Sequence, residues 1–209
     1  AIALGSGRVY LIDRPLAEGD TAARRTGTKQ TEPPAGRLLC LDSRTGKILW
    51  ETRDDIFGTL LVLSEKHGVV LMTYQPTSFR LDSEVGGRMA AFQASDGRRL
   101  WSIEAKYKSR PVVNDDAIYA EPGKWNLLTG EPMPFEFSRS YGCGILAGST
   151  GMLVFRSATL GYVDLETNSG TVNLGQRDSR GRPRLDGRRR ELVYVQLSQP
   201  GDDRPQAAK

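Results

Sequence analysis

The sequence predicts an all-β protein built from about four four-stranded units, and three observations lead to this fold class. Short apolar segments alternate with turns rich in Gly, Asp, Ser, Thr and Asn along residues 1–175. No segment there has the i, i+3, i+4, i+7 apolar spacing of an amphipathic helix. The pattern also recurs at intervals of roughly 40 residues, the length of one supersecondary unit in a repeat protein.

The repeat is clearest around two tryptophans. Residues 36–51 and 87–102 both carry glycine at their first and eleventh positions and tryptophan four residues later. Two weaker copies follow, each with a turn glycine of its own. The structural repeat positions are Gly46, Trp50, Gly97, Trp101, Gly130 and Gly170. Each copy is predicted to be a hairpin, because glycine supplies the positive φ that tight turns need.

A second kind of hairpin alternates with the first, and two hairpins in succession make one four-stranded unit. The four predicted units are residues 1–52, 57–104, 110–137 and 143–174. Tandem four-stranded sheets at this interval predict a β-propeller with about four blades, a partial or truncated ring. Residues 14–35 are predicted to be an exposed loop inside the first blade, and residues 176–209 a disordered, Arg-rich tail.

The formal net charge of +4 lies entirely in the tail. Residues 176–209 hold nine of the 29 basic residues and five of the 25 acidic ones, which leaves 20 of each in residues 1–175. Binding of nucleic acid by the body is therefore not predicted. The arginines of residues 177–190 favour a solvated tail over polyanion or anionic-membrane binding. Their abrupt start also allows translation to have left the ancestral frame near Gly175.

No catalytic or metal-binding residue is predicted. The single histidine, His67, lies in a turn sequence and is expected to be exposed. Four aspartates that end strands or flank turns, Asp13, Asp42, Asp96 and Asp164, are expected to cap backbone N–H groups. Cys40 and Cys143 have no CxxC or histidine partner for zinc, so we expect two buried thiols, with a disulfide as the alternative.

Residues 41–50, Leu-Asp-Ser-Arg-Thr-Gly-Lys-Ile-Leu-Trp, resemble the signature of the PQQ-like (pyrroloquinoline quinone) β-propeller repeat. The resemblance covers residues 1–175 and is strongest in the first two units. The family includes BamB-like assembly propellers and quinoprotein dehydrogenases. Membership would imply that Trp50 and Trp101 pack between adjacent blades, and that the protein works in an extracytoplasmic compartment.

The leading hypothesis for function is a non-catalytic scaffold for protein interaction, with a protein partner or missing blades completing the ring and no cofactor. The alternative is a fragment of a quinoprotein oxidoreductase, for which the resemblance implies PQQ and calcium; the adjacent cysteines common in that group are absent. The chain begins at Ala1 without a targeting pattern, which suggests a fragment or a processed chain. Its apolar runs are far shorter than the roughly 18–20 residues that a transmembrane helix needs.

Overall fold

The computed structural model describes residues 1–16, 20, 35–74, 86–135, 137, 146–156, 160–167 and 169–174. The chain divides into two compact units, Ala1–Leu174 and Gly175–Lys209. The tail predicted at residues 176–209 and most of the loop predicted at 14–35 lie outside the described residues. All that follows concerns the first unit.

Within the described residues, sixteen strands form four four-stranded antiparallel sheets, which confirms the predicted all-β, partial β-propeller architecture. Sheet 1 contains β1 (Ile2–Gly5), β2 (Arg8–Asp13), β3 (Arg37–Asp42) and β4 (Ile48–Thr52). Sheet 2 contains β5 (Leu60–Ser64), β6 (Val69–Thr73), β7 (Arg88–Gln93) and β8 (Arg99–Glu104). Sheet 3 contains β9 (Val112–Asn114), β10 (Ala117–Ala120), β11 (Gly123–Asn126) and β12 (Pro132–Met133). Sheet 4 contains β13 (Leu146–Ser149), β14 (Met152–Arg156), β15 (Leu160–Asp164) and β16 (Ser169–Leu174).

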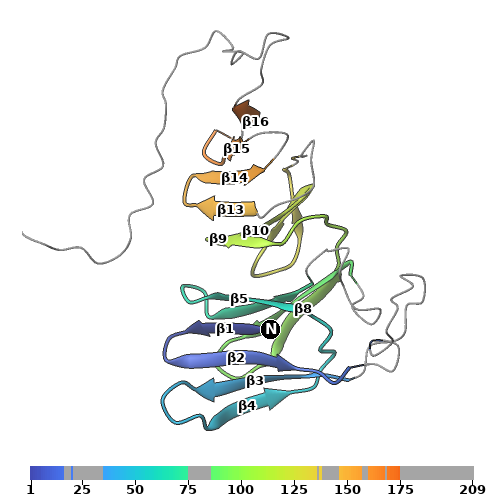
Figure 1. Ribbon diagram of the computed structural model, residues 1–209, viewed down its shortest axis with the longest axis vertical. Helices are drawn as coiled ribbons and strands as arrows, with labels where there is room; N and C mark the ends of the chain where they lie inside the picture. Colours follow the sequence, from blue (N-terminus) through green and yellow to red (C-terminus); the bar gives the residue numbers. More distant parts are fainter. Residues whose placement is uncertain are drawn as a thin grey trace, which may run out of the picture. The chain divides into compact units, whose positions relative to one another are not determined.

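Within each sheet, neighbouring strands are consecutive in the chain, as Figure 1 shows for β1 to β4. Side chains alternate between the two faces of a strand, and one residue in two therefore belongs to each face. The first strands of successive sheets contact one another: β1 with β5, β5 with β9, and β9 with β13. No described segment forms a helix of the length and hydrophobicity that a membrane crossing requires.

Three hydrophobic clusters hold the sheets face to face. The first lies between sheets 1 and 2, the second between sheets 2 and 3, and the third between sheets 3 and 4. Sheet 2 is buried on both faces, as β6 illustrates. Val70 and Met72 belong to the first cluster, whereas Val69 and Leu71 belong to the second. Stability in such an array comes mostly from contacts between neighbouring units.

Polar contacts also connect the turns that join the first two strands of each sheet. In sheets 1 and 2, Ser6 Oγ donates to Glu65 Oε1 at 2.7 Å. In sheets 2 and 3, Lys66 Nζ donates to Asp115 Oδ1 at 2.6 Å. In sheets 3 and 4, Asn114 Nδ2 donates to the Ser149 carbonyl at 3.0 Å. These contacts fix the turns of adjacent blades to one another.

His67 lies in one of these turns, as predicted, but the expectation that it is exposed is wrong. Its side chain is only 18% exposed, and Nε2 lies 3.0 Å from Asp115 Oδ1. The carboxylate of Asp115 also bonds Lys66, and these two contacts, with that of Lys66 the larger, hold the pKa of Asp115 below its ordinary value. His67 therefore takes part in the contact between sheets 2 and 3.

Replacing Thr73 by valine should stabilise the protein. Thr73 is fully buried at the end of β6, and its hydroxyl has no hydrogen-bond partner among the described residues. Burying an unpaired hydroxyl is unfavourable, so Thr73→Val should raise the free energy of unfolding by about 1 kcal/mol. Thr52→Val is the matched control, because the Thr52 hydroxyl accepts a hydrogen bond from Asp54 N at 3.3 Å. Urea titration of both variants measures the difference, and a less stable Thr73→Val protein would contradict the prediction.

Candidate interaction surface

The hairpins that join the third and fourth strands of the sheets are shaped by a carboxylate or amide. Asp42 Oδ1 accepts hydrogen bonds from Arg44 N at 3.1 Å and from Thr45 N at 2.7 Å. Asn126 Oδ1 in sheet 3 and Asp164 Oδ1 in sheet 4 accept two backbone N–H bonds each in the same way. In sheet 2 the third strand ends in Gln93, and Asp96 caps Arg98 N instead. These residues order the turns.

The structure thus places three of the four predicted capping aspartates, namely Asp42, Asp96 and Asp164, on backbone N–H groups. For Asp13 the described residues show a different contact. It is the last residue of β2, and its carboxylate forms an ion pair with Arg37, the first residue of β3. The two residues are directly opposed across the strand pair, which brings the arginine side chain within reach of the carboxylate.

Asp42 makes the stability of sheet 1 sensitive to acid. The hydroxyl and amide of Thr45 are the main cause of a pKa below the ordinary 3.8. A lowered pKa means that the carboxylate stabilises the fold above the unfolded-state pKa, and that this stabilisation is lost as pH falls through the folded-state value. Asp42→Asn should keep the turn, as Asn126 does in sheet 3. Between pH 6 and about pH 3, the melting temperature of this variant should fall less than that of the unchanged protein. An unchanged pH dependence of the melting temperature would refute this role.

The turn glycines follow the caps. Gly46, Gly97 and Gly130 have φ values of 69°, 76° and 76°, the left-handed conformation that glycine adopts without strain. Gly170 is different: it is the second residue of β16 rather than part of a turn. The position four residues after the capping Asp164 is Asn168, which lies outside the described residues. The sequence pattern alone could not separate these two positions, because Asn and Gly both favour such turns.

Trp50 and Trp101 each dock on the turn of the next sheet. Trp50 Nε1 donates to the Ala94 carbonyl at 3.1 Å, and Trp101 Nε1 donates to the Leu127 carbonyl at 2.9 Å. Each indole also lies against the glycine of that turn. A Cβ on Gly97 would stand 2.5 Å from Trp50 Cε3, and a Cβ on Gly130 would stand 2.8 Å from Trp101 Cε3. Only glycine allows this approach.

One face of sheet 1 looks away from sheet 2, and several of its apolar side chains, among them Ile2, Leu4 and Ile48, are exposed. In β1, Ile2 is 68% exposed and Leu4 is 70% exposed. The strand pairings place Ile2 opposite Leu11 and Leu4 opposite Val9, on the same face. The pairings continue across the sheet, so that the apolar residues of the outer face are Ile2, Leu4, Val9, Leu11, Leu39, Leu41 and Ile48. Leu39 is buried, and Val9, Leu11 and Leu41 are half-buried. A contiguous apolar surface of this kind is characteristic of a protein interaction site.

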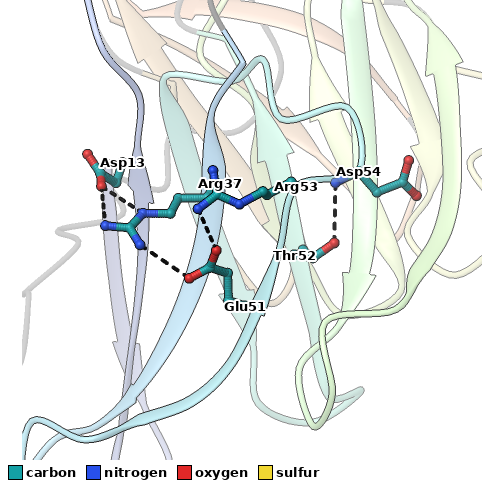
Figure 2. Close-up of polar contacts among 6 residues, drawn as sticks. All are labelled: Asp13, Arg37, Glu51, Thr52, Arg53 and Asp54. Carbon is teal, nitrogen blue, oxygen red and sulfur yellow. Dashed lines mark hydrogen bonds and ion pairs between the residues drawn. The ribbon is translucent and has the colours of Figure 1, made fainter.

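Charged side chains border this outer face. Arg37 contacts Asp13 at 2.8 Å and Glu51 at 3.2 Å, and Glu51 contacts Arg53 at 2.8 Å. Figure 2 shows the Arg37 guanidinium between the carboxylates of Asp13 and Glu51, and Arg53 in contact with the Glu51 carboxylate as well. These four residues carry no net charge together, and such exposed pairs contribute little to stability. An apolar centre with a polar, charge-balanced rim is the usual composition of an interface.

Three features of the described residues concern possible catalysis or ligand binding: clusters of metal-binding side chains, a cavity and a thiol. No group of three or more His, Cys, Asp or Glu side chains among them is placed to hold a metal ion. A cavity of about 230 Å³ lies between sheets 1 and 2, smaller than the roughly 300–1,000 Å³ of most ligand pockets. Arg8 and Tyr10 line it, but both donate to the Ala94 carbonyl, at 3.0 and 3.3 Å. Cys40 is a buried free thiol, and Cys143 lies outside the described residues.

No protein-family model matches the sequence, and no curated protein is significantly similar to it. Solved structures of several propellers are similar. BamB from Moraxella catarrhalis aligns with 71% of this chain and 49% of its own at 15% identity, with a TM-score of 0.49. A europium-containing methanol dehydrogenase aligns with 83% of this chain and 41% of its own at 9% identity, with a TM-score of 0.47. Quinohemoprotein alcohol dehydrogenase from Comamonas testosteroni aligns with 82% of this chain and 34% of its own at 12% identity, with a TM-score of 0.47.

The chain therefore spans less than half the length of each of these three structures. At such identities the likeness concerns the fold alone. BamB and quinoprotein dehydrogenases are the proteins to which the repeat signature pointed, and the four-sheet architecture itself rests on the strand pairings described above.

Proposed function

We propose that this chain is a non-catalytic scaffold of PQQ-like propeller blades that binds another protein in an extracytoplasmic compartment. The observation that carries the proposal is the outer face of sheet 1, where Ile2 and Leu4 are more than two-thirds exposed. Leaving such side chains in water costs roughly 25 cal/mol for each Å² of apolar surface that a partner could cover. A surface of this composition favours association with protein.

A photo-cross-linking experiment tests the proposal in the native cell. Benzoylphenylalanine replaces Ile2 in one variant and Leu128, which is 45% exposed in the third-sheet hairpin turn, in the control. Irradiation should join the Ile2 variant, and not the Leu128 variant, to one defined protein segment. Equal yields from both positions, or no protein adduct at Ile2, would overturn the proposed interaction.

The quinoprotein alternative remains a prediction from the resemblance. Its calcium would need several carboxylate or carbonyl oxygens converging on one point. Four of the described aspartates do not fit such a site, because Asp42, Asp96 and Asp164 bond their own turns and Asp13 pairs with Arg37. Titration with PQQ and calcium should therefore leave both the absorbance spectrum and the melting temperature unchanged, and a shift in either would revive this alternative.

A further inference from the structure

We propose that the Gly46 turn is a socket for a tryptophan carried by a four-stranded sheet from outside these 209 residues. This inference rests on the proposed function, since it names the partner of the same face of sheet 1. It follows from a comparison of the first turn with the two equivalent turns that hold an indole.

The three turns are equivalent residue by residue. Gly46 follows the end of β3 by four residues, as Gly97 follows the end of β7 and Gly130 the end of β11. In all three, the amide of the glycine donates to the carbonyl of that last strand residue at 2.9 Å. In each case the residue just after the strand also donates its backbone N–H to a carbonyl of the preceding hairpin turn. These residues are Ser43, Ala94 and Leu127. The backbone is therefore the same at the three sites.

The sites differ in what covers them. Gly97 and Gly130 are buried under the indoles of Trp50 and Trp101, whereas Gly46 is exposed. Among the described residues, no atom lies within 4 Å of a Cβ built on Gly46. The carbonyls that accept the indole N–H belong to Ala94 and Leu127, both buried, while their equivalent, Ser43, is exposed. The first turn thus has the shape and the acceptor of the other two without the indole.

The outer face of sheet 1 differs from the equivalent face of sheet 2 in the same way: one is exposed and the other is covered. The repeat and the strand pairings make Ile2 equivalent to Leu61 of β5, and Val9 equivalent to Val70 of β6. In sheet 2, Leu61 is 6% exposed and Val70 is fully buried against sheet 1. In sheet 1, Ile2 is 68% exposed. The outer face of sheet 1 therefore has apolar residues at the positions that, in sheet 2, pack against the preceding sheet.

The sequence itself does not supply the missing indole. It has three tryptophans, and Trp50 and Trp101 occupy the sockets of sheets 2 and 3. Trp125 packs against the cluster between sheets 2 and 3. The last strand of the fourth sheet, β16, has the sequence Ser-Gly-Thr-Val-Asn-Leu, without tryptophan. A second copy of the chain would have the same three indoles engaged, so the occupant is a different sheet that carries its own tryptophan.

The test gives the chain such a sheet. A second copy of residues 57–109 is placed directly before Ala1. The strand pairings make Ala1 equivalent to Arg110, the residue that follows this segment in the natural chain. The added copy of Trp101 is therefore separated from sheet 1 by the same number of residues as Trp101 is from sheet 3. We expect the tryptophan of the added copy to enter the Gly46 socket. Changing that tryptophan to phenylalanine should lower the melting temperature of the extended chain by about 4 °C.

A matched pair of glycine variants locates the effect. Gly46→Ala and Gly7→Ala impose the same backbone strain, since φ is 69° at Gly46 and 70° at Gly7, and neither has a described atom within 4 Å of a built Cβ. In the Gly46→Ala background the change from tryptophan to phenylalanine should shift the melting temperature by less than about 1 °C. In the Gly7→Ala background the full shift should remain. Equal shifts in both backgrounds, or no shift in the parent, would overturn the socket.

If the extended chain does not fold, N-acetyltryptophanamide added to the 209-residue chain serves as the probe. It should move the amide NMR signals of Gly46 and Ser43 and leave that of Gly7 in place; no such difference would equally overturn the inference. The outcomes separate this inference from the proposed function. A cross-link at Ile2 without a tryptophan effect would remove the socket alone, and a tryptophan effect without a cross-link would remove the proposed function alone.

Discussion

Replacing Phe92 by alanine is expected to lower the free energy of unfolding by about 3–5 kcal/mol, which is the range for a phenylalanine lost from a packed core. Phe92 is fully buried in β7 and belongs to the cluster between sheets 1 and 2. Its removal takes away apolar contacts with both sheets and leaves a cavity that the rigid strand pairings cannot close. Urea unfolding followed by circular dichroism measures the loss.

Leu41→Ala is the informative control, because Leu41 occupies the same repeat position in sheet 1 as Phe92 in sheet 2. Leu41 is only half-buried, on the outer face, and has no sheet of the described residues opposite it. Its truncation should therefore cost less than about 1.5 kcal/mol. Comparable losses at the two positions would mean that burial between blades is not what stabilises the array.

Gly97→Ala should be the second most damaging substitution, with a loss of about 3 kcal/mol or more. Part of this is the strain of alanine in a left-handed conformation, about 1–2 kcal/mol. The rest comes from the Cβ, which would stand 2.5 Å from Trp50 Cε3 and must push the indole away from the Ala94 carbonyl. Thermal and urea unfolding should both show this loss of stability, and the fluorescence maximum of Trp50 should shift towards that of an exposed indole.

Gly46→Ala in the same 209-residue chain separates the two contributions. Its φ of 69° is close to the 76° of Gly97, but no described atom lies near the new methyl group. It should lose only the strain energy, about 1–2 kcal/mol. If both alanine variants lose the same amount, the contact between glycine and indole contributes nothing to the packing of sheets 1 and 2.

Much of this architecture was readable from the sequence, because its signals are local. The spacing of Gly46 and Trp50, repeated at Gly97 and Trp101, is that of a hairpin, and hairpins are set by turn chemistry within a few residues. The outer face of sheet 1 was not predicted, although Ile2 and Leu4, like Val9 and Leu11, are two residues apart and so share a face of their strand. Alternation identifies a face, but it cannot say whether another sheet covers that face.

The packing of Trp50 and Trp101 between blades was implied by the resemblance, but the polar contacts between blades were beyond sequence reasoning. The side chains of Ser6 and Glu65, or of Lys66 and Asp115, lie 59 and 49 residues apart in the chain and meet only after the sheets have packed. Nothing in the turn sequence around His67 predicts that its ring will be largely covered by a neighbouring turn. The ion pair of Asp13 was not foreseen for the same reason, since its partner Arg37 is brought opposite by the pairing of β2 with β3.

The burial of β6 on both sides has a consequence for the newly made chain. Residues Val69–Thr73 contain no charge and no proline, and all five are buried in the folded protein. Before sheets 1 and 3 enclose it, this segment is a short, strongly β-forming stretch of the type that pairs with other chains and aggregates. Sheet 2 made on its own is therefore expected to aggregate, because both of its apolar faces would then be exposed to solvent.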